Sequence, residues 1–243
     1  MWSAKREPAI AVASIPALIE RWRLHCMAAA RVAQAERGRF ALAVPGGSVA
    51  RAFLPALIEA DIAWDRLDLF FCDERCVSAD DPESNFALAE ELLLAPLGER
   101  GPRVHRMAGD DPEPERAAHD YGRAMRFVLG SPPVLDLALL GLGEDGHVAS
   151  LFPGRPALEA LDPSVLVEPD APKPPRTRLT LSLEVLAAAR EVIVAAFGHA
   201  KAGAVAYALH DPTSASPLAR LLHRARAATL MLDEEAASVI ARP

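Results

Sequence analysis

The sequence has little cysteine, no long apolar run and no excess of basic charge. Cysteine occurs three times, at Cys26, Cys72 and Cys76, without a Cys-x-x-Cys pair. This odd set supports neither a disulfide framework nor a zinc site, so we expect free thiols in a reducing, cytoplasmic compartment. No segment approaches the roughly 20 apolar residues that cross a bilayer, and we therefore expect no membrane association.

Basic residues are outnumbered, because Lys and Arg total 26 against 33 Asp and Glu, which gives a net charge of −7. Affinity for nucleic acid comes from clustered Lys and Arg, and the chain has no basic run, so no nucleic-acid partner is expected. The 24% charged and 51% hydrophobic residues are typical of a globular protein. We expect a single domain over residues 1–243, present as a monomer or a weak homo-oligomer.

The N-terminal segment combines charge with apolar residues, as a secretory signal does, because Lys5 and Arg6 precede an apolar stretch. Glu7, Ser14 and Pro16 interrupt that stretch. The apolar residues after Ser14 recur at helical spacing, so we expect an amphipathic helix here and not a cleaved signal.

Apolar segments of strand length alternate with helical segments along most of the chain. Strands are predicted at residues 40–44, 67–72, 103–107, 134–143, 178–183, 191–198 and 228–233. Helices are predicted at residues 14–39, 48–60, 83–98, 113–129, 199–209 and 218–226, with a short acidic helix after the last strand. This alternation is typical of an α/β fold, with a mostly parallel, Rossmann-like sheet and helices on both faces.

Three local features are expected within this pattern. Ser48 is the predicted N-cap of the second helix, and Ser84 or Asn85 opens the third. The segment from Arg155 to Pro175 is dense in proline and poor in periodicity, so it is expected to be a long loop.

Chemically unusual residues follow the carboxyl ends of several predicted strands, where ligands of open α/β sheets bind. One such turn contains Gly46, Gly47 and Ser48. Two glycines let backbone N–H groups approach a ligand, and the following helix favours an anion such as phosphate. An ordinary strand-to-helix turn is the alternative. The next strand ends at Asp73-Glu74-Arg75, and the forked guanidinium of Arg75 suits phosphate or carboxylate, although a local surface ion pair would explain it too.

The segment "GLGEDGHVASLFPG", residues 141–154, is the most informative. It resembles a dinucleotide fingerprint, but Gly146 comes one position too early for Gly-x-Gly-x-x-Gly, so a nucleotide cofactor is not expected. His147 is either a buried packing residue or a reactive imidazole that Asp145 orients. The surrounding glycines and the strand-end location favour the reactive imidazole.

Two further cations follow later strands or begin them. Lys201 lies in the first turn of a predicted helix, and Arg178 begins a predicted strand after the proline-rich segment. Both are candidates for binding a phosphate in the same pocket, and a solvated surface lysine is the alternative for Lys201. No cofactor and no metal site are expected.

Five segments together resemble the 6-phosphogluconolactonase family. They are "VPGGSVA", "FFCDERCVSADDPESNFALAEELLL", "GLGEDGHVASLFPG", "PPRTRLTLSLEVLAAAREV" and "GHAKAGAV", and they occur in the family's order between about residues 40 and 210. The resemblance implies a fold similar to that of glucosamine-6-phosphate deaminase. It also implies metal-free hydrolysis of 6-phospho-D-glucono-1,5-lactone to 6-phospho-D-gluconate in the oxidative pentose phosphate pathway.

Departures and alternatives follow from the same resemblance. The family's threonine after the Gly-Gly-Ser turn is Val49 here, so one hydroxyl that the family supplies is missing, and Ala50 replaces its proline. Related deaminases have a glutamate five residues after the histidine, where this chain has Phe152, which favours the lactonase. A deaminase or isomerase of phosphosugars and a non-catalytic sugar-phosphate sensor are the alternatives.

The resemblance also predicts roles for the candidate residues. His147 is the expected general base that activates water, with Asp145 orienting it, and an unperturbed imidazole pKa of about 6.5 suits this task. The expected ligands of the 6-phosphate are Arg178 and Lys201, with Gly46, Gly47 and Ser48. Arg75 is predicted to bind phosphate or to polarise the carbonyl, and Asp73 to position either the sugar hydroxyls or Arg75.

Overall fold

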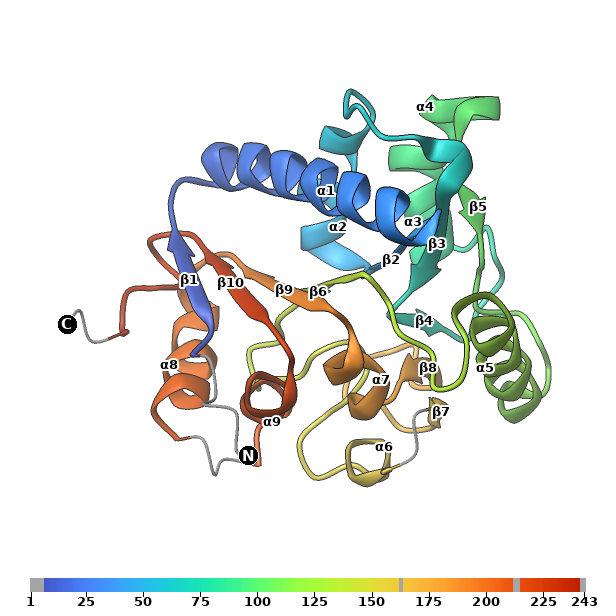
Figure 1. Ribbon diagram of the computed structural model, residues 1–243. Coiled ribbons are helices and arrows are strands. Elements are labelled where there is room, and N and C mark those ends of the chain that lie inside the picture. The colour runs from blue at the N-terminus through green and yellow to red at the C-terminus, as the bar shows by residue number, and fades with distance from the viewer. Residues whose placement is uncertain (1–6, 162–163, 212–214, 241–243) are drawn as a thin grey trace, which may run out of the picture.

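The computed structural model describes residues 7–161, 164–211 and 215–240, so Lys5 and Arg6 lie outside the described residues. Within these ranges seven parallel strands form the main sheet, in the spatial order β1-β10-β9-β6-β2-β3-β5 (Figure 1). Their bounds are β1 (Ala9–Val12), β10 (Ala228–Leu232), β9 (Glu191–Ala196), β6 (Leu137–Gly141), β2 (Phe40–Val44), β3 (Leu67–Phe71) and β5 (Arg103–Val104). The predicted parallel sheet is confirmed.

Helices cover both faces of the sheet, as predicted: Figure 1 shows α1 and α2 on one side and α7, α8 and α9 on the other. The helices are α1 (Ile15–Arg37), α2 (Gly47–Phe53), α3 (Asn85–Ala89), α4 (Ala95–Leu97), α5 (Pro114–Leu129), α6 (Pro156–Glu159), α7 (Leu183–Ala188), α8 (Ala202–His210) and α9 (Pro217–Arg224). A π-helical segment (Glu90–Leu94) joins α3 to α4, and short 3-10 turns occur at Pro55–Leu57, Trp64–Arg66, Gly98–Arg100 and His199–Lys201.

Burial explains why these segments form the core. Every residue of β2 is buried, which fits a central strand with helices on both faces. In α1 the buried side chains recur every three or four residues, which gives the helix one apolar stripe toward the sheet. The helix ends at Gly38, whose φ of 75° is the left-handed conformation that glycine adopts easily.

The segment from Arg155 to Pro175 differs from its prediction as a long loop. It contains α6 and a strand, β7 (Val165–Glu168), while Asp162 and Pro163 lie outside the described residues. β7 pairs antiparallel with β8 (Arg178–Leu181), which pairs in turn with β4 (Asp73–Arg75). Four-residue elements are too short for a periodic pattern to emerge between the prolines, so sequence alone did not indicate them. Arg178 therefore begins a strand of a second, small antiparallel sheet.

Several element ends also differ from the predictions. The N-cap of α2 is Gly46 and not Ser48, and the helix ends at Phe53 because Pro55 starts a separate turn. The last segment after β10 forms turns where a short acidic helix was predicted. β1 was not predicted at all. Ser84 is the N-cap of α3, since its side chain accepts a hydrogen bond from the Ala87 N–H.

The order of the strands positions the candidate residues. β9, β6, β2 and β3 are neighbours and parallel, so their carboxyl ends lie along one edge of the sheet. The glycine turn follows β2, the histidine segment follows β6, and Lys201 follows β9. β4 follows β3 and brings the small sheet to the same edge.

Candidate active site

An open pocket of about 650 Å³ lies at this edge of the sheet. Eight of the nine candidate residues from the sequence line it: Gly46, Gly47, Ser48, Asp73, Arg75, His147, Arg178 and Lys201. The ninth, Asp145, does not line the pocket but is hydrogen-bonded to His147, which does. The structure thus brings the predicted residues together from five separate segments of the chain.

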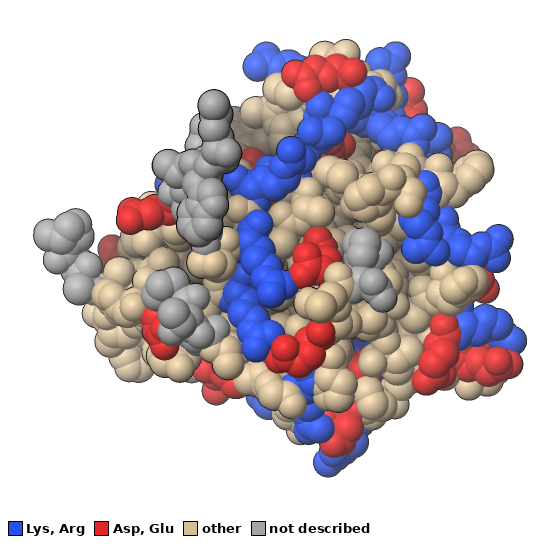
Figure 2. All heavy atoms as spheres, turned by 60° about the horizontal axis from the view of Figure 1, so that its bottom comes forward, with Lys and Arg blue, Asp and Glu red and all other residues tan. Residues whose placement is uncertain are grey.

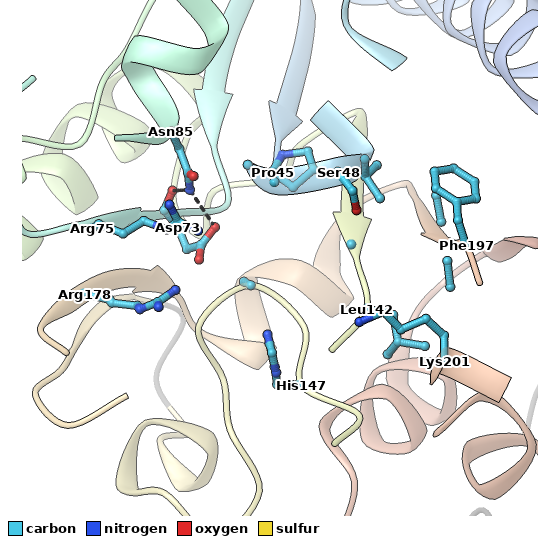
Figure 3. A pocket seen from close by; sticks show the side chains of 17 residues that line it. Pro45, Ser48, Asp73, Arg75, Asn85, Leu142, His147, Arg178, Phe197 and Lys201 are labelled. Carbon is cyan, nitrogen blue, oxygen red and sulfur yellow. Dashed lines mark hydrogen bonds between the residues drawn. The ribbon is translucent and has the colours of Figure 1, made fainter. Parts of the chain in front are cut away.

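The glycine turn forms one wall of the pocket (Figure 3). Gly47 has a φ of 67°, which an L residue rarely adopts, so the turn requires glycine at this position. Ser48 is exposed, whereas the Val49 side chain is buried against Gly141 of β6. Val49 therefore packs in the core, where the apolar side chain needs no hydrogen-bond partner.

The imidazole of His147 lies in the pocket and is not sealed in the interior, because 31% of its side chain is exposed. Its Nδ1 lies 2.6 Å from Oδ1 of Asp145. An ionised carboxylate only accepts hydrogen bonds, so Nδ1 carries a proton, and in the neutral form of the imidazole the lone pair is on Nε2. Partial burial raises the pKa of Asp145, but the hydrogen bond and charge of His147 outweigh it, and the net pKa lies below the ordinary value.

Gly143 makes this pair possible. A Cβ atom at this position would lie 2.0 Å from Nδ1 of His147 and 2.7 Å from Oδ1 of Asp145. The backbone of the loop is held by hydrogen bonds from the Gly143 N–H to the His147 carbonyl, at 2.8 Å, and from the Gly146 N–H to the Gly143 carbonyl, at 3.1 Å. The imidazole and the carboxylate thus rest directly on the backbone of a residue that has no side chain.

Phe152 also contacts the imidazole of His147. Its ring centroid lies 4.5 Å from that of His147, and the guanidinium carbon of Arg178 lies 5.9 Å from the same phenyl centroid. The ring is buried, with 4% exposed. Phe152 therefore packs against both the candidate base and one of the candidate phosphate ligands.

Two arginines face each other across the small sheet. Arg75 of β4 is the register partner of Arg178 of β8. Nε and Nη2 of Arg178 donate to the carbonyls of Pro175 and Lys173, both at 3.1 Å, and Arg75 donates to the Glu83 carbonyl. Like charges directly opposite in a sheet are unfavourable, so an anion between them would be stabilised.

The electrostatics at Arg178 reflect its burial. Burial is the largest cause of a lowered pKa at this guanidinium, the Asp73 carboxylate opposes the shift, and the charge of Arg75 adds to it. Arginine nevertheless remains charged in proteins, so its charge is held here in a poorly solvated place. An anionic ligand would replace part of the lost solvation.

Lys201 enters the pocket from the side opposite Arg178, with His147 between them (Figure 3). Its Nζ lies 3.9 Å from Oε1 of Glu144, a long contact to a side chain that is 64% exposed. A surface pair of this kind contributes little, about 0–1 kcal/mol, and leaves the ammonium available to a ligand.

Asp73 is buried, with 6% exposed, and both of its carboxylate oxygens accept hydrogen bonds. Oδ2 accepts from the Ser150 hydroxyl at 2.6 Å, and Oδ1 from the Asn85 amide at 3.1 Å. Ser150 belongs to the histidine segment, so Asp73 links that segment to β4. Neither oxygen of Asp73 contacts Arg75 among the interactions of the described residues.

Sequence reasoning missed the residues that support the pocket. Asn85 lines it, whereas the sequence predicts only that this residue or Ser84 opens a helix. Gly143 and Ser150 lie within the histidine segment, but their spacing does not indicate their roles. The imidazole of His147 packs against the backbone of Gly143, and the hydroxyl of Ser150 donates a hydrogen bond to Asp73. For Phe152 the family resemblance indicates only that related deaminases have a glutamate at this position, and not that the ring contacts His147. These roles depend on contacts between segments that are far apart in the chain.

Two other properties concern the surface and possible ligands. Figure 2 shows one face on which Lys and Arg side chains form short bands that alternate with acidic and uncharged residues.

No group of three or more His, Cys, Asp or Glu side chains that could hold a metal ion occurs among the described residues. Across the same ranges, no helix has both the length and the apolar character that spanning a membrane requires.

Comparison with known proteins identifies the family. A model for "Glucosamine-6-phosphate isomerases/6-phosphogluconolactonase" matches residues 14–231. The chain belongs to this family. The 6-phosphogluconolactonase of Rattus norvegicus is 40% identical over 222 residues, which cover 88% of this chain and 86% of the relative.

Two solved structures align with nearly the whole chain. The 6-phosphogluconolactonase from Trypanosoma brucei is 29% identical and aligns with a TM-score of 0.84 over 97% of this chain and 99% of its own. A monomeric glucosamine-6-phosphate deaminase is 19% identical and aligns with a TM-score of 0.79 over 96% of this chain and 100% of its own. The second similarity concerns the fold alone. The family resemblance and fold class predicted from the sequence are confirmed.

Proposed function

We propose that this protein hydrolyses 6-phospho-D-glucono-1,5-lactone to 6-phospho-D-gluconate, in the oxidative pentose phosphate pathway. One observation carries the proposal: an imidazole hydrogen-bonded to a carboxylate at 2.6 Å lies in a pocket with three cationic side chains. A phosphorylated lactone needs a base for water and positive charge for its phosphate. The high coverage by relatives named 6-phosphogluconolactonase supports this choice over amine chemistry.

In the proposed mechanism His147 is the general base. Its free Nε2 takes a proton from water, whose oxygen attacks C1 of the lactone to form a tetrahedral oxyanion. Collapse of this intermediate re-forms the carbonyl and breaks the bond from C1 to the ring oxygen, which receives the proton from the imidazolium. Asp145 keeps the proton on Nδ1 and stabilises the imidazolium while it lasts.

The remaining residues bind and orient the substrate. Arg178 and Lys201 hold the 6-phosphate from two sides, and the backbone N–H groups of Gly46, Gly47 and Ser48 add donors at the turn. Arg75 adds positive charge for the phosphate or the carbonyl oxygen. For Asp73 we propose a role at the sugar hydroxyls, because its two oxygens are fixed by Ser150 and Asn85 without contact to Arg75.

The reaction needs no cofactor, and we propose that the chain works in the cytoplasm as a single domain over residues 1–243, as a monomer or a weak homo-oligomer without nucleic-acid partners. Its three thiols are free, which supports a reducing compartment. Burial raises the pKa of Cys76 to about 11, with the charges of Glu74 and Glu115 adding to the shift, so this thiol is mostly protonated at neutral pH.

The test replaces His147 with alanine. Turnover should fall by about 10²–10⁴-fold, the usual contribution of a general base, while KM changes little. Initial rates are compared with the uncatalysed opening of the lactone, which proceeds in water unaided. Wild-type protein that releases ammonia from glucosamine 6-phosphate, or that binds the lactone tightly without hydrolysing it, would contradict the proposed reaction.

A further inference from the structure

Asn85 lines the pocket and contacts both Asp73 and the glycine turn (Figure 3). It is the first residue of α3 and is 2% exposed. Its Nδ2 donates two hydrogen bonds to Asp73, one to the backbone carbonyl at 2.9 Å and one to Oδ1 at 3.1 Å. A single amide group therefore holds both the main chain and the carboxylate of Asp73.

The oxygen of the same amide faces the glycine turn. Oδ1 of Asn85 is buried and has no hydrogen-bond partner among the described residues. It lies 1.7 Å from the place that a Cβ atom of residue 46 would occupy. Rotating the amide by half a turn would put this oxygen against two acceptors of Asp73, so its orientation is fixed. Gly46 and Asn85 thus interlock, and only glycine leaves room for the amide.

The side chain of Asn85 is not required to form its helix. Ser84 caps α3 through the Ala87 N–H. The buried carboxylate of Glu74 accepts from the Asn85 N–H at 2.7 Å and the Phe86 N–H at 2.8 Å. These bonds satisfy the helix start without the Asn85 amide. A buried carbonyl oxygen without a partner is unfavourable for folding, so local stability does not explain the placement.

We propose that Asn85 is a positioning residue that fixes Asp73 relative to the glycine turn. The inference rests on the proposed function, in which Asp73 orients the ring hydroxyls and the turn helps to bind the phosphate. Asn85 then sets the distance between the two ends of the substrate. Without the amide, Asp73 keeps only the Ser150 hydroxyl as a hydrogen-bond partner of its side chain, and Oδ1 loses the donor that fixes its position.

The test is a double-mutant cycle with Asn85→Ala, Asp73→Ala and the double variant. Asn85→Ala alone should lower kcat/KM for the lactone by about tenfold or more, since small misplacements of positioned groups are costly. In the Asp73→Ala background the same substitution should change kcat/KM by less than about twofold. If Asn85 acts through Asp73, the effects of the two substitutions on kcat/KM are not additive. Ser84→Ala is the matched control: it removes the cap of the same helix, so it should lower the melting temperature and leave kcat/KM of the folded enzyme unchanged.

Additive effects of the two substitutions, or a wild-type kcat/KM in Asn85→Ala, would overturn the role of Asn85. If Asn85→Ala does not fold, Asn85→Ser replaces it, because a serine side chain is too short to reach the carboxylate. The same cycle is measured on the affinity for 6-phosphogluconate by calorimetry, where the coupling should recur. The wild-type rate of lactone hydrolysis tests the proposed function separately, so a failure of either idea is recognised on its own.

Discussion

Replacing Gly143 with alanine is a sharp probe of the histidine segment. The added methyl group would lie 2.0 Å from Nδ1 and 2.2 Å from Cε1 of His147, and 2.7 Å from Oδ1 of Asp145. Gly143 does not have a left-handed φ, so alanine is compatible with its backbone. The substitution therefore acts through the collision alone. It displaces the imidazole and the carboxylate without changing either.

The size of the displacement follows from the contact distances. Ordinary van der Waals contact begins at 3.4 Å, so Nδ1 must move from 2.0 Å by about 1.4 Å. A misplacement of about 1 Å can cost on the order of 10²-fold in rate. Complete loss of a general base costs about 10²–10⁴-fold. We expect kcat to fall by about 10²-fold or more. Folding should suffer little, because the partly exposed imidazole has space to turn outward.

The assay is the initial rate of lactone hydrolysis with the spontaneous rate subtracted, together with thermal unfolding of each variant. Gly203→Ala is the matched control, since no atom lies within 4 Å of its added Cβ and the residue sits in α8. It should keep the wild-type kcat and gain up to roughly 1 kcal/mol of stability. A well-folded Gly143→Ala protein with kcat within about twofold of wild type would refute the reasoning, since 10²-fold is the expected scale.

Two further predictions concern charge. The lowered pKa of Asp145 means that the folded state binds fewer protons there than the unfolded state, so its stabilisation is present above the unfolded pKa of about 4 and is lost as the pH falls through the folded value. The difference in unfolding free energy between wild type and Asp145→Asn should therefore shrink between pH 5 and pH 2 in chemical denaturation; an unchanged difference would contradict the shift. Lys201→Ala and Arg178→Ala each remove a charge-assisted contact of about 1.5–3 kcal/mol, so KM should rise roughly 10- to 100-fold with little change in kcat. Loss of kcat at constant KM would show that these cations act on the reacting centre instead of the phosphate.

Sequence periodicity predicted the inner strands of the main sheet because they are buried on both faces, and it predicted the long helix α1 because that helix has one apolar stripe. β2, for example, is entirely apolar and entirely buried. The same reasoning placed the glycine turn, the histidine segment and Lys201 at one edge, because parallel strands end together. These features depend on patterns within single segments, and a sequence records such patterns directly.

The small sheet was not predictable in the same way. β7 and β4 have four and three residues, which is too little for alternation to distinguish a strand from a loop. Its effect on the site is large, because it makes Arg178 the register partner of Arg75. About a hundred positions separate these two arginines in the sequence, and only the pairing of the short strands β4 and β8 brings their charges to one pocket.

The glycines of the site also have different reasons to be glycine, and this distinction explains what sequence reasoning leaves open. At Gly47 the backbone is left-handed and no atom lies within 4 Å of a built Cβ, so the constraint is conformational. At Gly46 and Gly143 the φ is ordinary, and the missing side chain is replaced by a functional group of another residue, Asn85 or His147. The sequence pattern of a turn predicts only the conformational constraint, in which a left-handed backbone requires glycine. The second kind links the backbone of each loop to a side chain in the pocket, so the geometry of the site is fixed by close contact with the main chain.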